Sequence, residues 1–258
     1  MNFNPLHATG LVFLKDGKQG FSFAGSCFLF REDNVVLTAA HCVPASIDTV
    51  IVHFPFARRE MQVEEIHRHP TADVALLICE ARYAYRSGNG YPETAFWDGV
   101  SNFTLGEQFS AFGYPSEGPT FNSEASPTPR FFTGHYQRFF DYESHDGFKY
   151  QAGELSIPAP GGLSGGPVFR SAAPQMITGL VTANAETYAI TDSIDDVLSD
   201  GTKYRQESRR VLTYGVALML SDHAQWLHSY VPNPTSRGWT LKDPITGDDP
   251  TARIEDEI

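Results

Sequence analysis

Short runs of β-branched and aromatic residues recur along the chain, and clusters of Gly, Pro and Asn separate them. Short strands punctuated by turns are typical of an all-β protein. With 258 residues, the chain can form one large all-β domain or two small barrels that share a cleft. The predicted strands are Ala8–Leu14, Phe21–Arg31, Asn34–Thr38, Thr49–Phe54, Met61–His67, Asp73–Ile78, Gln108–Gly113, Arg130–Arg138, Pro167–Phe169, Met176–Thr182 and Val211–Leu220.

One helix is predicted near the end of the chain. Ser221 is placed as its N-cap, apolar residues follow at helical spacing, and Pro232 stops the run. Two internal segments are expected to be irregular, 116–129 and 184–210, and the second carries Asp192, Asp195, Asp196 and Asp200. Residues 232–258 are rich in Pro, Gly and acidic residues and are expected to form an extended or disordered tail.

Composition excludes several classes of function. The formal net charge of −12 disfavours nucleic-acid binding, which needs a basic surface. No run of 18 apolar residues predicts a membrane span, and no signal peptide is visible, so a cytoplasmic location is expected, or a secreted one if the chain was trimmed from a precursor. Three cysteines allow one disulfide at most.

Two of the segments that matter for chemistry are weak signals when taken alone. In Val36-Leu37-Thr38-Ala39-Ala40-His41-Cys42, small residues at a strand end leave His41 room to face a cleft. In Ala72-Asp73-Val74-Ala75-Leu76-Leu77-Ile78, one carboxylate opens an apolar strand and needs a hydrogen-bond donor, which an imidazole supplies. A surface histidine and a turn-forming aspartate are the simpler interpretations.

The third segment, Gly161-Gly162-Leu163-Ser164-Gly165-Gly166-Pro167, is more specific. Glycines allow the positive φ and the close approach that a nucleophile loop needs, and successive backbone N–H groups there can point at one oxyanion. A Gly-rich surface turn is the alternative. Taken together, the three segments occur in the order His, Asp, Ser, which is one of the known orders of a catalytic triad.

On these three segments the chain resembles the chymotrypsin/trypsin family of serine peptidases. Looser similarity covers about residues 8–231 and includes Gly113-Tyr114-Pro115, a strand end frequent in bacterial members. The resemblance implies two six-stranded antiparallel β-barrels with a C-terminal helix. It places His41 and Asp73 in a barrel at 1–103 and Ser164 in a second barrel with the helix at 104–231. Cys27 and Cys42 sit where the family often has a disulfide, so they are either bridged or a buried thiol pair.

The resemblance also implies a role for each site residue. Ser164 is the nucleophile, His41 the general base and acid, and Asp73 the group that orients the imidazole; the N–H groups of Gly162 and Ser164 form the oxyanion hole. Substrate-binding positions implied in the same way are Pro158, Ala159, Thr182, Ala183, Asn184 and Gly215. No metal and no cofactor is expected; His67 and His69 are interpreted as part of a surface turn.

Three departures from the family pattern refine this expectation. Leu163 stands where digestive members carry an Asp that pairs with a new N-terminus, so no activation by N-terminal trimming is expected. Pro158 stands where trypsin keeps its acid, so small or apolar side chains should be preferred at the cleavage site over Arg or Lys. The segment 184–215 is unusually long; its aspartates contact a basic substrate or a regulatory partner, or form a solvated acidic loop.

The expected activity is therefore hydrolysis of peptide bonds by a trypsin-like serine endopeptidase, with limited cleavage of a protein partner as its role. The expected partners are a protein or peptide substrate and a regulatory protein, with neither nucleic acid nor membrane. Two other functions remain open: a protease fold kept as a binding or regulatory module, and an esterase that uses the same triad.

Overall fold

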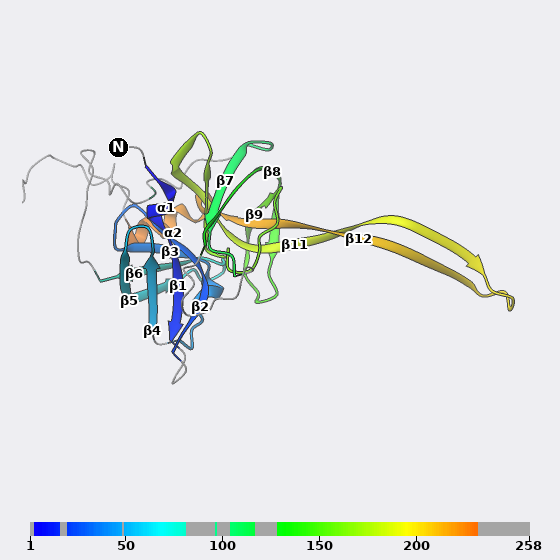
Figure 1. Ribbon diagram of the computed structural model, residues 1–258, viewed down its shortest axis with the longest axis horizontal. Helices are drawn as coiled ribbons and strands as arrows, with labels where there is room; N and C mark the ends of the chain where they lie inside the picture. Colours follow the sequence, from blue (N-terminus) through cyan, green and yellow to red (C-terminus); the bar gives the residue numbers. More distant parts are fainter. Residues whose placement is uncertain are drawn as a thin grey trace, which may run out of the picture.

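The computed structural model describes residues 3–15, 20–47, 49–80, 96, 104–116 and 128–231. Strands dominate this part of the chain, and they form two six-stranded antiparallel rings (Figure 1). A short helix, α1 (Pro5–Ala8), precedes the first strand and begins where the side chain of Asn4 accepts a hydrogen bond from the N–H of Leu6. The predicted tail at 232–258 lies outside the described residues.

The first ring is closed by pairings in the order β1-β2-β3-β6-β5-β4. Its strands are β1 (Thr9–Lys15), β2 (Phe21–Leu29), β3 (Val35–Thr38), β4 (Thr49–Phe54), β5 (Arg59–Arg68) and β6 (Ala75–Cys79). Every one of these strands overlaps a predicted one. Asp73, which was predicted to open the sixth strand, lies just before β6 instead.

The second ring is closed in the order β10-β11-β12-β9-β8-β7. Its strands are β7 (Gln108–Gly113), β8 (Arg130–Glu143), β9 (Lys149–Leu155), β10 (Pro167–Arg170), β11 (Ala173–Val197) and β12 (Lys203–Met219). β9 was not predicted from the sequence. β8, β11 and β12 extend well beyond their predicted bounds.

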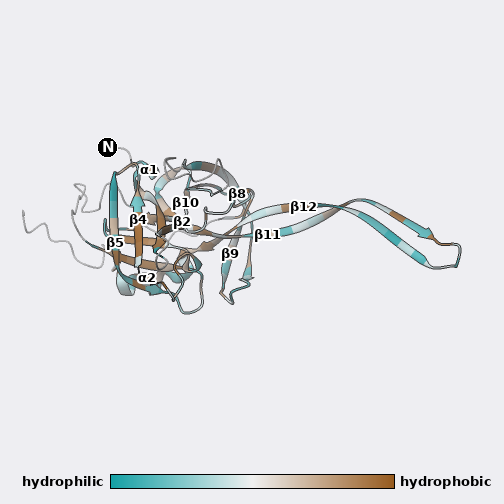
Figure 2. Cartoon of the chain, turned by 60° about the horizontal axis from the view of Figure 1, so that its bottom comes forward, coloured by the Kyte–Doolittle hydropathy of each residue, from teal (hydrophilic) through white to brown (hydrophobic). Residues whose placement is uncertain are grey.

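The prediction of an irregular segment at 184–210 was wrong. β11 and β12 pair from Gly179↔Met219 to Val197↔Lys203, with register shifts at Val181/Ala183 and Ile190/Asp192. The outer part of this hairpin projects from the second barrel (Figure 1). We call residues 184–215 the arm. Its tip is closed by a turn in which Gly201 has a φ of 86°. Most of the outer arm is hydrophilic, whereas the barrel strands carry the hydrophobic residues (Figure 2).

Aromatic residues join the two barrels. The ring of Phe96 lies 5.5 Å from that of Phe28 in β2 and 5.5 Å from that of Phe169 in β10, measured between centroids, and all three side chains are buried. This packing fixes the first barrel against the second.

The last described elements are a 3-10 turn, η2 (Leu220–His223), and helix α2 (Ala224–Tyr230). The predicted helix is therefore present, but Ser221 lies inside the 3-10 turn and is not the N-cap, which is His223. Among the described residues, no helix is both long enough and apolar enough to cross a membrane.

Candidate active site

Strand pairing brings His41 and Asp73 together. His41 lies in a 3-10 turn, η1 (Ala40–Cys42), directly after β3, and Asp73 lies directly before β6. Because β3 and β6 are antiparallel, with Thr38 opposite Ala75, the end of one strand meets the start of the other. Two residues that are far apart in the sequence thus share one end of the first barrel.

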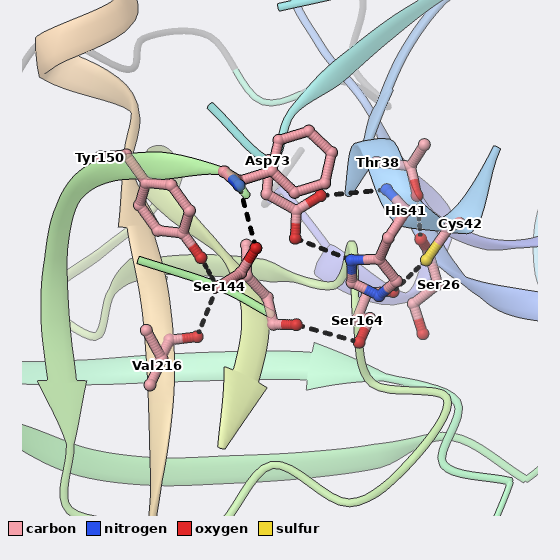
Figure 3. A network of polar contacts seen from close by, with 11 residues as sticks. Ser26, Thr38, His41, Cys42, Asp73, Ser144, Tyr150, Ser164 and Val216 are labelled. Atoms are coloured by element: carbon pink, nitrogen blue, oxygen red, sulfur yellow. Dashed lines mark hydrogen bonds and ion pairs between the residues drawn. The ribbon is translucent and has the colours of Figure 1, made fainter. Parts of the chain in front are cut away.

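Two hydrogen bonds join these residues. The Nδ1 atom of His41 lies 2.7 Å from Oδ2 of Asp73, and the backbone N–H of His41 donates to Oδ1 at 3.0 Å (Figure 3). Asp73 is 3% exposed, whereas the His41 side chain is 33% exposed. The carboxylate therefore holds the ring from its buried side, and a proton on Nδ1 leaves Nε2 as the basic nitrogen.

This arrangement changes the acidity of the imidazole. Burial lowers the pKa of His41, but the hydrogen bond and charge of Asp73, with a contribution from Cys42, outweigh burial and raise the pKa above its ordinary value of 6.5. Asp73 thus stabilises the imidazolium form of His41.

Ser164 comes from the second barrel, in the turn between β9 and β10. Its hydroxyl donates to the carbonyl of Thr182 at 3.4 Å, and within the described residues it has no hydrogen bond with His41. Its carbonyl accepts from the backbone N–H of Ser26 at 2.8 Å and from the thiol of Cys42 at 3.7 Å. Both contacts come from the first barrel, and they place Ser164 in the same polar network as His41 and Asp73 (Figure 3).

Ser26, in β2, is a supporting residue that no motif in the sequence indicates. Its hydroxyl donates to the carbonyl of Gly162 at 2.8 Å and accepts from the N–H of Tyr114 at 2.8 Å. Its carbonyl accepts from the hydroxyl of Thr38 at 2.8 Å. One serine of the first barrel therefore fixes the loop that carries the nucleophile candidate.

A second unpredicted support is Tyr150 in β9, which is 7% exposed. Its hydroxyl donates to Oγ1 of Thr182 at 2.8 Å, and that hydroxyl donates in turn to the carbonyl of Val216 at 3.1 Å (Figure 3). This relay fixes Thr182, whose carbonyl holds the Ser164 hydroxyl. Burial first, and Asp73 and Tyr142 after it, raise the pKa of Tyr150, so its hydroxyl remains a neutral donor.

A family model described as a trypsin-like peptidase domain matches residues 25–177, more than half of the chain. The chain belongs to the trypsin-like peptidase family. As a trypsin-like peptidase, it is a serine endopeptidase. No curated protein sequence matches it.

Solved protease structures share the fold of this trypsin-like peptidase. The inactive form of the Rv3671c protease from M. tuberculosis has 16% sequence identity and a TM-score of 0.56, with 87% of this chain and 89% of that chain covered. The MamO protease domain from Magnetospirillum magneticum has 13% identity and a TM-score of 0.57, covering 87% and 97%. The HtrA-type protease AlgW, solved with a tripeptide, has 19% identity and a TM-score of 0.57, covering 88% of this chain and 60% of that one. The predicted trypsin-like double barrel is confirmed.

The glycines around Ser164 in this trypsin-like peptidase have no room for a side chain. At Gly162, with a φ of 86°, a Cβ atom would lie 2.6 Å from the N atom of Ser116 and 2.7 Å from the carbonyl of Tyr114. At Gly165, with a φ of 81°, it would collide with the carbonyl of Ser26 and the hydroxyl of Thr38. The loop therefore needs glycine both for its backbone conformation and for its fit against the first barrel.

The substrate-binding positions predicted from the family resemblance lie around the base of the arm. Asn184 holds Ala159 by two hydrogen bonds, from the N–H of Ala159 to Oδ1 at 2.7 Å and from Nδ2 to the carbonyl of Ala159 at 2.6 Å. The N–H of Gly215 donates to the carbonyl of Ile157 at 2.5 Å. Pro158, between these contacts, is exposed, and Ala183 pairs with Val216 in the β11–β12 ladder.

The cysteines and histidines outside the site have structural surroundings. Cys27, Cys42 and Cys79 are buried free thiols. His67 stacks on Tyr230 and bonds Glu65 at 3.0 Å, and His69 accepts backbone N–H bonds in the loop before Asp73. Within the described part of the chain, no group of three or more His, Cys, Asp or Glu side chains could hold a metal ion.

Proposed function

We propose that this trypsin-like peptidase hydrolyses peptide bonds with Ser164 as nucleophile, His41 as general base and acid, and Asp73 as the residue that orients His41. The paired hydrogen bonds between Asp73 and His41 carry the proposal. The buried carboxylate of Asp73 bonds Nδ1 of His41 and leaves Nε2 as the basic nitrogen. The first barrel also anchors the Ser164 loop, through the bond from the Ser26 N–H to the Ser164 carbonyl.

The reaction begins when the Ser164 hydroxyl turns from the Thr182 carbonyl to the Nε2 atom of His41, forming a hydrogen bond as substrate arrives. Oγ attacks the scissile carbonyl while Nε2 takes its proton. His41 then gives this proton to the leaving amine, and the peptide remains as an ester on Ser164. Water, deprotonated by His41, cleaves the ester and restores the hydroxyl.

Backbone N–H groups of the nucleophile loop stabilise the oxyanion. Three amides of the loop are bonded within the fold, those of Leu163, Gly165 and Gly166. Those of Gly162 and Ser164 donate to no protein acceptor in the described residues. These two free donors support their proposed role as the oxyanion hole. Removal of one such donor costs about 2.7–4 kcal/mol of transition-state stabilisation.

The cleavage site should contain a small or apolar residue. Pro158 and Ala159 offer no acid to pair with Arg or Lys, and the Asn184 side chain spans the gap between Ala159 and β11. A long cationic side chain would have to displace this clamp and would meet no opposite charge. A panel of fluorogenic peptides that differ only in the residue before the scissile bond tests this; a clear preference for Arg or Lys would contradict it.

Activity should not require trimming of the N-terminus. Leu163 is fully buried in the second barrel, beside Phe109, Ala111 and Val168. It contributes packing where digestive members use an ion pair, so the nucleophile loop is stabilised without a new amino terminus. An enzyme that is active without such trimming suits limited cleavage of a chosen protein partner.

A fluorophosphonate probe and peptide hydrolysis together test the function. Wild-type protein should be labelled and should cleave peptides, and Ser164→Ala should do neither. Ser208→Ala, an exposed serine of the arm, is the matched control and should behave as wild type. Absence of labelling would favour a binding module, and turnover of esters without peptides would favour an esterase.

A further inference from the structure

The outer edge of β11 is covered by successive elements until it reaches the site. β10 pairs with it as far as Leu180. Beyond Leu180, the nucleophile loop (residues 161–166) covers the edge. Val181 exchanges backbone hydrogen bonds with Gly165 and Gly166, and the Thr182 carbonyl accepts a hydrogen bond from the Ser164 hydroxyl. From Ala183 to Val197, β11 pairs only with β12 among the described elements. The outer edge of β11 therefore loses its backbone partners beside Ser164.

A free edge of this kind is a binding surface. In a two-stranded antiparallel ladder, every second residue directs its N–H and C=O away from its partner strand, so the arm presents a row of unpaired donors and acceptors. At a strand rise of about 3.3 Å per residue, the free edge from Ala183 to Val197 spans roughly 45 Å. An isolated hairpin is only marginally stable in water, so the arm gains from a third strand.

The two strands of the arm carry opposite charges. The β11 part has Glu186, Asp192, Asp195 and Asp196 and no base, a formal charge of −4. The β12 part has Lys203, Arg205, Arg209 and Arg210 against Glu207, a formal charge of 4 − 1 = +3. The strand whose free edge continues from the site, β11, is therefore the acidic strand of the arm.

Much of this acidic charge is not neutralised inside the arm. Arg205 bridges Asp195 and Glu207, and Arg209 pairs with Glu207 at 2.7 Å. Glu186, Asp192 and Asp196 form no ion pair in the described part of the chain, and their side chains are exposed. A ligand on this edge would meet three acidic groups that have no cationic partner.

Apolar side chains lie between these acids along β11. Tyr188 is 55% exposed, Ile190 is 48% exposed and Ile194 is 52% exposed. Strand addition uses main-chain hydrogen bonds for affinity and contacts with alternate side chains for specificity. Because the register shift at Ile190/Asp192 puts acids and apolar residues on both faces of β11, the edge is suited to an extended peptide with basic and aliphatic residues on both of its faces.

The direction of such a peptide follows from the ladder. A third strand antiparallel to β11, the more stable orientation, has its C-terminal end beside Ser164 and its N-terminal part along the arm. We propose that the free β11 edge binds a basic, extended segment of the substrate that precedes the scissile bond. With one-to-one pairing, Glu186 faces the substrate roughly five residues before the cut and Asp192 about ten before it. This inference rests on the proposed function, because Ser164 defines the cut.

Peptide binding to the Ser164→Ala protein separates the edge from catalysis. Three fluorescent peptides share one alanine-rich core. One is the core alone, and two carry ten further upstream residues in which pairs of Val alternate with pairs of Lys or with pairs of Glu, so that both faces of the strand carry charge. Fluorescence anisotropy should show the Lys peptide binding at least about tenfold more tightly than the core alone, since strand addition adds main-chain bonds to charge contacts. The Glu peptide should bind no better than the core.

The charge variant Glu186→Lys/Asp192→Lys/Asp196→Lys should abolish this advantage and leave binding of the core unchanged. The matched control, Glu64→Lys/Asp146→Lys/Asp222→Lys, alters three exposed acids outside the arm and should keep the advantage. Equal binding of the core and the Lys peptide, or an advantage that survives in the arm variant, overturns the inference.

Two further outcomes separate the inference from its alternatives. If the Lys peptide binds as expected but wild-type protein neither cleaves it nor reacts with fluorophosphonate, peptide binding by the β11 edge is supported and the proposed catalytic function is wrong. A wild-type dimer by light scattering that becomes monomeric in the arm variant overturns the inference in favour of a second copy of the chain.

Discussion

The side-chain amide of Asn184 bonds both backbone groups of Ala159, donating to the carbonyl at 2.6 Å and accepting from the N–H at 2.7 Å. Asn184 belongs to the base of the arm, and Ala159 to the segment that leads into the nucleophile loop. One side chain thereby ties the strand proposed to hold the substrate to the segment proposed to line its pocket.

Asn184→Ala should loosen this segment. The free energy of unfolding should fall by about 1–3 kcal/mol, because two backbone groups lose their partners. The preference for small residues at the cleavage site should weaken in the same variant. Asn184→Asp, which still accepts from the Ala159 N–H but cannot donate to its carbonyl, should give an intermediate result. Urea unfolding and the peptide panel measure both effects, and unchanged selectivity in Asn184→Ala would rule out a role in the pocket.

Gly165→Ala should damage the junction between the barrels. A methyl group there collides with the Ser26 carbonyl and the Thr38 hydroxyl, so we expect a loss of more than about 3 kcal/mol of stability together with loss of fluorophosphonate labelling. Gly147→Ala is the matched control: its φ is 84°, but nothing lies within 4 Å of the new methyl group. Backbone strain alone should then cost about 1–2 kcal/mol, and labelling should persist.

Asp73→Asn should change both the rate and its pH dependence. The rate at the plateau should fall about 10⁴-fold, because His41 loses its correct tautomer and the charge that stabilises its protonated form. Since Asp73 raises the pKa of His41 in the wild type, the rise of kcat/KM with pH should have its midpoint above 6.5 and should move to lower pH in the variant. A midpoint that stays fixed would show that another group controls the rate.

Acid should destabilise the fold through His223. Burial, and to a lesser extent His69, lowers the pKa of His223 from 6.5 to about 4, and its Nε2 atom is buried without a hydrogen-bond partner. Between these two pH values the unfolded chain binds more protons than the folded one, so stability falls as pH falls from 6.5 to 4. His223→Gln should flatten this dependence in urea unfolding. His145→Gln, an exposed histidine, should follow the wild-type curve.

The sequence predicted the first barrel well because its strands are runs of β-branched and other apolar residues between turn-forming residues. In β4, for example, Val50, Val52 and Phe54 face the core and the intervening residues are less buried. The site residues were chosen from three short motifs, and the structure brings His41 and Asp73 into direct contact. The bond between Ser164 and His41 is not formed, so the full triad remains a proposal.

β9 was not predicted because two of its residues are unfavourable in an isolated strand, and only their partners on β8 make them acceptable. Glu154 is buried, which an isolated strand would not tolerate, but Arg138 in β8 bonds it at 2.7 Å. Gly153 weakens strand propensity, yet a side chain there would collide with the ring of Tyr136. Both partners lie on another strand and leave no local signal.

The sequence of the arm contains a hairpin pattern, but its many acidic residues favoured the prediction of an irregular loop. Asp200-Gly201 is a typical hairpin turn, and β-branched and aromatic residues such as Tyr188, Ile190 and Val211 flank it on both sides. The four aspartates between Asp192 and Asp200 suggested a loop. Of these, Asp195 faces Arg205 on β12, whereas Asp192 faces Ser208 and Asp196 faces Tyr204. An acidic strand is tolerable here because these side chains are exposed to water.

The dependence of the nucleophile loop on Ser26 has a consequence for biosynthesis. Ser26 leaves the ribosome early, and the loop whose carbonyls it bonds, those of Gly162 and Ser164, emerges much later. The second half of the chain by itself lacks these two bonds, and the first half lacks the loop. A nascent first barrel is therefore harmless, and hydrolytic power arises only when the second half is complete and docked, which protects the cell from a partly made protease.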